Sequence, residues 1–259
     1  AYPVVSAPYG LKPINLIGGQ VFAGSTRNYP IQYGYATNIF YGDIVNIIRG
    51  SIVDNADTTD STGTGIVGVF LGCSYTNPST KQKQFAQYWP AGTAAGDCQA
   101  IICDDPDTVF KVVMCSATTV IASAASAMLG QNFGLIQNAG NVNTGNSAVA
   151  ALYSSSTTGA DLALRVVGLV GETSVTTSVT GSSSSTTITC SALPNALVVG
   201  TDVAYIAANG QLVQTGSYVS VAAAAGATSV TINSTIAVPG SVTAIPSSST
   251  IVFTQFPEM

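Results

Sequence analysis

Short apolar runs that alternate with polar residues cover most of the chain and predict β-strands. YGYATNIFYGDIVNIIRGSI, from Tyr33, and GIVGVFLGCSYT, from Gly65, are rich in β-branched and aromatic residues. FAQYWPAGT, CQAIICDDP and VFKVVMC follow at short spacing, separated by Gly, Asp, Asn and Pro. This pattern is typical of an all-β barrel or sandwich. TTVIASAASAMLGQNFGL departs from it and predicts a short helix over residues 121–129 that Gly130 ends.

The alternation continues beyond residue 172, but the composition changes there. In residues 173–259, Ser and Thr supply 30 of 87 residues, and Asp202 and Glu258 are the only charged residues. Such a composition can indicate disorder. TTITCSAL, LVVGTDVAYIA, QLVQTGSYVSV and TIVFTQF nevertheless alternate as strands do. The sequence NGQ at residues 209–211 predicts a hairpin turn between two of these strands.

These patterns predict a β-barrel or sandwich core with an additional small Ser/Thr-rich β module near the C-terminus. We expect residues 1–172 to form a β-rich domain with an extended N-terminal arm, and residues 173–250 to form a module that faces solvent. Residues 251–259 are expected to return to the first domain as a last strand. The apolar residues expected to form the small core of the module are Val203, Tyr205, Ile206, Leu212 and Val219.

The predicted surface is short of charge. Only 7% of the 259 residues are charged, whereas an ordinary soluble domain has about 25%. Such a deficit is expected where partner subunits cover much of the surface, or where Ser and Thr coat a β protein. The net charge of −5 argues against a nucleic-acid partner, because phosphate contacts need Lys and Arg.

The sequence predicts neither a membrane partner nor a secretory route. Glycines and polar residues interrupt every apolar run before it reaches the length of a transmembrane helix. The first residues, AYPVVSAPYG, lack the basic start and leucine-rich centre of a signal peptide. We therefore expect the chain to be made in a cytoplasm.

The residue types needed for common catalytic and metal sites are scarce. Histidine is absent, so neither a Ser–His–Asp triad nor a Cys–His pair can form. The five cysteines contain no CxxC pair, and most lie in apolar runs such as AIIC and VVMC, which favours core positions over a zinc site. We expect no enzyme activity, no catalytic or metal site and no cofactor.

Two acidic clusters are candidate sites. Asp104, Asp105 and Asp107 in DDPDTVF fit a turn in which Pro106 sets the backbone. Asp54, Asp57 and Asp60 recur at a spacing of three residues but match no calcium-loop template. Both clusters are interpreted as structural.

The most unusual stretch is GLKPINLIGGQVFAGSTRNYPI, at residues 10–31. It is not a phosphate-binding loop, because Pro30 lies where the helix of such a loop would run. It is strongly apolar, and Pro3, Pro8 and Pro13 favour an extended backbone. Two interpretations stay open: an arm that adds to a neighbouring subunit, or the first strand of the chain's own domain.

GLKPINLIGGQVFAGSTR, IFYGDIV, GVFLGCSYT, QYWPAG and DDPDTVF, in this order, resemble structural proteins of tailed bacteriophages that infect aquatic bacteria, of the cyanophage-like type. The resemblance covers residues 9–170. It implies a capsid cement or decoration protein that binds the major capsid protein on the outer surface of the virion, as a homotrimer. The alternative is a phage appendage protein, such as a fibre or a receptor- or glycan-binding protein.

Tyr88 and Trp89 are candidates for an interface or for the core, in preference to a glycan-stacking platform. The candidate capsid or subunit contacts are Tyr9, Leu11, Pro13, Ile14, Leu16, Ile17, Gly18, Gly19, Gln20, Phe22, Arg27, Tyr88 and Trp89.

Overall fold

The structure, a computed structural model, describes residues 5–55, 59–60, 65–155, 162, 164–234, 236 and 244–259. It consists of antiparallel sheets and three short 3-10 turns, which confirms the predicted all-β class. The chain divides into two compact units. We call Ala7–Val113 with Asn132–Leu164 the inner unit, and Ala1–Ser6, Met114–Gln131 and Arg165–Met259 the terminal unit.

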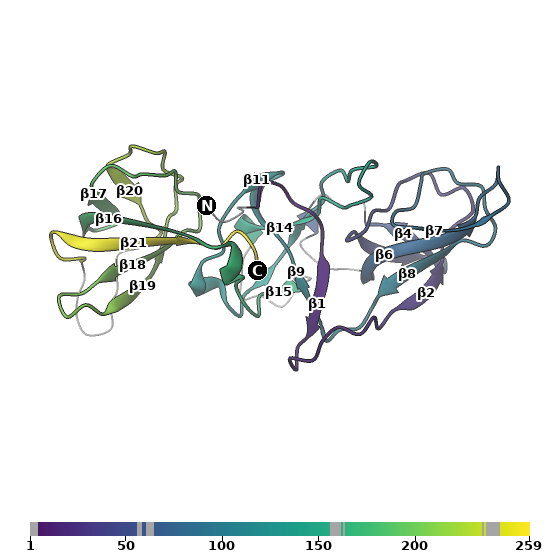
Figure 1. The fold of residues 1–259 in the computed structure, drawn as a ribbon, viewed down its shortest axis with the longest axis horizontal. Coiled ribbons are helices and arrows are strands. Elements are labelled where there is room, and N and C mark those ends of the chain that lie inside the picture. The colour runs from purple at the N-terminus through teal and green to yellow at the C-terminus, as the bar shows by residue number, and fades with distance from the viewer. Residues whose placement is uncertain are drawn as a thin grey trace. The chain divides into compact units, whose positions relative to one another are not determined.

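The inner unit is built around a sheet in the order β2-β8-β6-β3-β4, with β7 paired to β6 (Figure 1). Its strands are β2 (Arg27–Pro30), β3 (Ile44–Ile48), β4 (Ser51–Asp54), β6 (Ile66–Thr76), β7 (Lys83–Ala86) and β8 (Gln99–Cys103). Its core contains Phe70, Ile102 and Trp89, all fully buried. Gly68 of β6 is required because a Cβ there would lie 2.2 Å from the Cys103 carbonyl oxygen.

Shorter elements complete the inner unit. β1 (Lys12–Leu16) pairs with β9 (Thr108–Lys111), and β13 (Leu135–Ile136) pairs with β5 (Thr59–Asp60) and β14 (Ala150–Leu152). The remaining elements are β12 (Asn132–Phe133), the 3-10 turn η2 (Tyr153–Ser155) and β15 (Leu164–Arg165), where the chain leaves the unit.

The terminal unit contains a six-stranded antiparallel sheet in the order β19-β18-β21-β16-β17-β20. Its strands are β16 (Val175–Ser184), β17 (Thr187–Cys190), β18 (Asp202–Ile206), β19 (Leu212–Tyr218), β20 (Ser229–Thr231) and β21 (Ser249–Gln255). Alternation at period two buries one face: Val179, Ile188, Ile251 and Phe253 are all buried, while their neighbours along the strands are more exposed.

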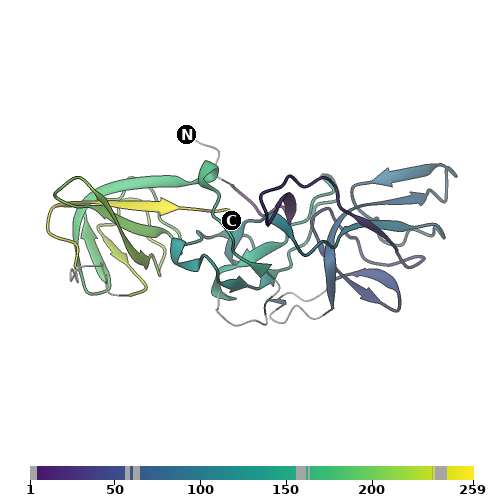
Figure 2. The ribbon, with the colours of Figure 1, turned by 90° about the horizontal axis from the view of Figure 1, so that it is seen from below.

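The position of β21 corrects part of the prediction for residues 251–259. The residues after β21 do bond to segments predicted in the first domain, since the N–H groups of Met114 and Val170 donate to the carbonyl oxygens of Pro257 and Glu258 at 3.0 and 3.1 Å. β21 itself does not pair with a strand of that domain. It lies between β16 and β18 and pairs with both (Figures 1 and 2). A strand with neighbours on both sides satisfies its backbone groups along its whole length, so β21 is a central strand of the Ser/Thr-rich sheet.

The terminal unit also includes Met114–Gln131, which the sequence analysis placed in the first domain. β10 (Met114–Ala117) pairs with β11 (Val120–Ile121), and two 3-10 turns follow along the chain, η1 (Ser126–Met128) and η3 (Gly171–Thr173). The predicted helix at residues 121–129 is wrong except for the η1 turn. The N–H groups of Ser123 and Ala124 instead donate to other parts of the unit, the carbonyl oxygens of Val199 and Phe256, both at 2.8 Å.

No helical segment in the described part of the chain is long and apolar enough to cross a membrane.

A buried carboxylate ties η1 to the sheet. The backbone N–H of Ser126 donates to both carboxylate oxygens of Asp202, at 2.9 and 3.0 Å, and the Ser126 hydroxyl donates to the same group. Burial raises the pKa of Asp202, while these hydrogen bonds oppose that rise. Asp202 begins β18, so the contact joins two segments far apart in the sequence.

The hairpin predicted at residues 209–211 is confirmed. β18 and β19 pair across it, Gly210 has a φ of +82°, and the N–H of Ala207 donates to the Gln211 carbonyl oxygen at 2.9 Å. The predicted module core is right for Val203, Tyr205 and Val219, which are buried. It is wrong for Ile206 and Leu212, which are 39% and 50% exposed.

Candidate functional site

The unusual N-terminal stretch forms a strand of its own chain. β1 pairs antiparallel with β9, from Lys12 opposite Lys111 to Leu16 opposite Thr108. A tight turn follows, in which the Leu16 N–H donates to the Gln20 carbonyl oxygen and the Gly19 N–H donates to the Leu16 carbonyl oxygen, both at 2.8 Å. Gly19 has a φ of +80°, which favours glycine. Residues 12–16 are therefore the first strand of the chain's own domain and not an arm that pairs with a neighbouring subunit.

The turn leaves three aliphatic side chains outside. Ile14 is 42% exposed, Ile17 65% and Val21 78%. Gly18, Gly19 and Gln20 between them are also exposed, whereas Pro13, Leu16 and Phe22 are half-buried. We call Ile14, Ile17 and Val21 the apolar edge of the β1–β9 ribbon.

Two of the predicted contact residues are not available to a partner. Leu11 and Trp89 have no exposed surface. The Trp89 ring meets Tyr75 edge-on at a centroid distance of 5.5 Å, and the half-buried Tyr88 stacks on Phe40 at 5.6 Å. The core interpretation of Trp89 is confirmed, because a fully buried ring cannot stack on a sugar.

Arg27 is engaged within its own chain. Its Nε lies 3.1 Å from the Asp104 carboxylate, and the Tyr29 hydroxyl donates to the same carboxylate at 2.8 Å. That hydrogen bond is the main cause of the raised pKa of Tyr29.

The predicted turn at DDPD is confirmed, since the N–H of Asp107 donates to the side chain of Asp105 at 3.0 Å.

The ribbon also brings together three residues that were not predicted as a group. Lys12 and Lys111 face each other across β1 and β9. The Lys12 Nζ lies 4.5 Å, and the Lys111 Nζ 5.8 Å, from the centre of the Tyr9 ring. Tyr9 was a predicted contact, but the lysines are 99 residues apart and only the strand register joins them.

Two carboxylates of the inner unit are perturbed. Burial raises the pKa of Asp43 to about 6, and burial together with the charge of Asp43 raises the pKa of Asp54 to about 7. Asp43 is only 2% exposed, so it has no access to a substrate. Asp57 lies outside the described residues. In the described part of the chain, no three His, Cys, Asp or Glu side chains are grouped as metal ligands.

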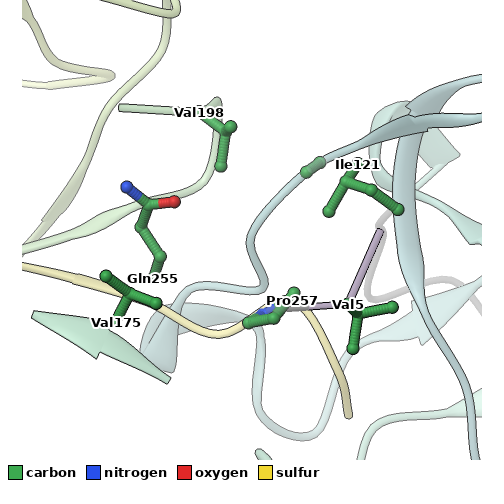
Figure 3. Close-up of a pocket in the computed structure, with 7 residues that line it drawn as sticks. Val5, Ile121, Val175, Val198, Gln255 and Pro257 are labelled. Atoms are coloured by element: carbon green, nitrogen blue, oxygen red, sulfur yellow. The ribbon is translucent and has the colours of Figure 1, made fainter. Parts of the chain in front are cut away.

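A small hollow in the terminal unit is lined by Val5, Ile121, Ala122, Val175, Val198, Gln255 and Pro257. Figure 3 shows Val5 and Ile121 on one side, Val175, Val198 and Gln255 on the other, and Pro257 between them. Its volume of about 120 Å³ is well below the roughly 300–1,000 Å³ of typical ligand pockets. The Gln255 amide already donates to the Ala196 carbonyl oxygen at 3.1 Å. The hollow is therefore a packing feature of the terminal unit.

No protein-family model, curated protein or solved structure matches this chain. The apolar edge of the β1–β9 ribbon reaches the surface, as do other large apolar side chains such as Phe85, which is 80% exposed.

Proposed function

We propose that this chain is a structural virion protein, a capsid cement or decoration protein that binds over junctions between major capsid protein subunits. The observation that carries the proposal is the apolar edge, three exposed aliphatic side chains on a well-defined ribbon. Large exposed apolar patches mark protein–protein interaction sites, and these three exposed side chains lie close together in the sequence, on β1 and on the turn that bridges Val21 back to Asn15. The phage resemblance of residues 9–170 supplies the class of partner.

The energetics suit a repetitive assembly. Fully burying an aliphatic side chain stabilises a complex by about 1.5–3 kcal/mol. The edge residues are already partly buried, so each subunit gains only a few kcal/mol from them. A homotrimer would present three such edges to three equivalent capsid sites, and linked binding raises the overall affinity without new contacts. We propose this arrangement on the outer surface of the head, where added contact area opposes internal pressure.

Substitution of Val21 tests the proposal. Val21→Asp places a charge in the proposed interface, and we expect binding to heads stripped of this protein to fall by about tenfold or more, because the carboxylate is desolvated without a partner. Val142→Asp is the matched control, since Val142 is also an exposed valine of the inner unit, at 51%. Binding of Val21→Asp at wild-type affinity would refute the apolar edge as the contact.

Copy number separates this function from the alternative. Quantitative mass spectrometry of virions should find hundreds of copies of a cement protein. A few copies per virion would instead indicate an appendage protein, such as a fibre or a receptor- or glycan-binding protein. A particle map without density for this protein at the three-fold positions would contradict the proposed homotrimer.

A further inference from the structure

One aromatic ring stands almost fully exposed on the main sheet of the inner unit. Phe85 of β7 is 80% exposed, the highest value among the large apolar side chains that the structure describes. Phe85 lies opposite Ser74 of β6, whereas the next pair, Ala86 and Cys73, packs into the core. Successive side chains of a strand point to opposite faces, so the Phe85 ring stands on the outer face of the sheet, where a ligand can cover it.

The ring begins a row of polar side chains that runs across the sheet (Figure 1). Ser74 lies between Phe85 on β7 and Gln99 on β8, and Pro30 of β2 continues the row. Directly opposite residues share a face, so Ser74 and Gln99 lie about 5 Å and about 10 Å along the row from Phe85. Within the described residues, neither the Ser74 hydroxyl nor the Gln99 amide has a hydrogen-bond partner. An exposed ring is thus followed by open donors and acceptors.

The two charged residues that flank this row neutralise each other. Lys83 lies two residues before Phe85, and its Nζ is 2.9 Å from the carboxylate of Asp97, two residues before Gln99. The backbone N–H and the hydroxyl of Thr76 donate to the same carboxylate, at 2.8 and 2.7 Å. The hydrogen bond from Lys83 is the main cause that holds the pKa of Asp97 well below its usual range. Both members of the pair are therefore charged, and together they leave the face around the ring without net charge.

We propose that Phe85, Ser74 and Gln99 form a binding site for a neutral saccharide. One face of a pyranose ring presents C–H groups that can cover the Phe85 ring, while its hydroxyls can exchange hydrogen bonds with Ser74 and Gln99. An apolar protein surface fits less well, because it would bury both polar side chains without partners. A nucleic acid also fits less well, because phosphates need cationic contacts and Lys83 is already paired.

The site goes beyond the proposed capsid contact, which uses the apolar edge of the β1–β9 ribbon and none of these three residues. It is tested by NMR titration of the full chain with three neutral oligosaccharides: cellopentaose, maltopentaose and N-acetylchitopentaose. We expect at least one of them to give saturable shifts at Phe85, Ser74 and Gln99. Added salt should leave these shifts unchanged, because the ligand carries no charge.

The deciding variant is Phe85→Ala, which truncates an exposed side chain and so spares the fold. It should bind the oligosaccharide about tenfold more weakly, whereas Phe85→Tyr keeps the ring and should bind within about twofold of wild type. Val142→Ala is the matched control at another exposed apolar position of the inner unit and should bind as wild type does. Gln99→Met removes the amide at similar size and should weaken binding by about threefold to tenfold. Unchanged fluorescence of the buried Trp89 verifies that the variants fold.

No saturable shift at Phe85 with any of the three oligosaccharides would overturn the site, and so would equal binding by Phe85→Ala. In a second arm, Phe85→Ala should bind stripped heads as wild type does. If it binds heads more weakly and wild type binds no oligosaccharide, the ring is a protein contact and the saccharide assignment is wrong. If wild type binds an oligosaccharide at these residues but does not bind heads, the saccharide site stands and the proposed function fails.

Discussion

Asp43 makes the stability of the inner unit depend on pH. Its side chain is 2% exposed, and one carboxylate oxygen accepts from the Phe40 N–H at 2.6 Å. Burial raises its pKa to about 6, although the hydrogen bonds from Ser147 and Phe40 oppose the rise. In the unfolded chain the pKa of an aspartate is about 3.9. At a pH between these two values, Asp43 therefore keeps its proton in the folded state and loses it in the unfolded state.

The difference between the folded and unfolded pKa values of Asp43 sets the direction and the size of the change in the free energy of unfolding with pH. Between about pH 4 and pH 6 the folded state binds more protons than the unfolded state, so the free energy of unfolding falls as the pH rises. A difference of about two pH units, at 1.4 kcal/mol per unit, corresponds to about 3 kcal/mol. Asp54, with a pKa raised to about 7, extends the same fall to about pH 7. Above that pH both carboxylates are charged and the penalty is complete.

Asp43→Asn removes the charge and keeps most of the shape. Asparagine can still accept from the Phe40 N–H through its carbonyl oxygen, so we expect the variant to be about 1–2 kcal/mol more stable than wild type at about pH 8. This is the penalty of about 3 kcal/mol less about 1 kcal/mol for an imperfect hydrogen bond. The advantage should shrink towards about pH 4, where wild-type Asp43 is protonated in the folded state. The variant should also lower the pKa of Asp54, because the charge of Asp43 contributes to its rise.

Urea unfolding at several pH values measures the free energy of unfolding of wild type and of Asp43→Asn. Trp89 is the only tryptophan of the chain and shares a core with Val45, two residues after Asp43, so its fluorescence reports on the inner unit. Asp107→Asn, an exposed carboxylate of the same unit, is the control for the charge change. Wild-type stability that rises between about pH 5 and pH 7, or an Asp43→Asn variant with no advantage at about pH 8, would refute the reasoning.

Three further predictions concern packing and thiols. Gly181→Ala places a Cβ about 2.4 Å from the Thr189 carbonyl oxygen, so amide hydrogen exchange of β16 and β17 should show a loss of about 1–3 kcal/mol. Leu11→Ala, at a fully buried position, should lower the free energy of unfolding by about 2–5 kcal/mol, and an unchanged Trp89 unfolding midpoint would contradict the burial. All five cysteines are buried, and burial raises the pKa of Cys73 to about 12 and of Cys115 to about 11. A thiol reagent should therefore label them only on unfolding, and rapid labelling of the native chain would count against this.

Local patterns in the sequence predicted many of the strands and two turns, although they also predicted a helix over residues 121–129 that the structure does not contain. Alternation at period two indicates which side chains share a face, and this predicted the all-β class and the burial of Val203 and Tyr205. The turn at residues 209–211 follows from the backbone preference of Gly210 alone, and the DDPD turn from Asp and Pro. For Trp89 the sequence left core and interface open, and its complete burial in the structure decides for the core.

Only the tertiary structure decided which strands lie next to each other. Backbone hydrogen bonds between strands are alike for every sequence, so periodicity cannot place β21 between β16 and β18 rather than in another sheet. For the same reason the sequence could not predict that Lys12 lies opposite Lys111, because that contact depends on the register of β1 against β9. Asp43 was missed for a related reason. A carboxylate beside a strand is normally solvated, and its burial depends on parts of the chain as distant as Ser147, which donates a hydrogen bond to it.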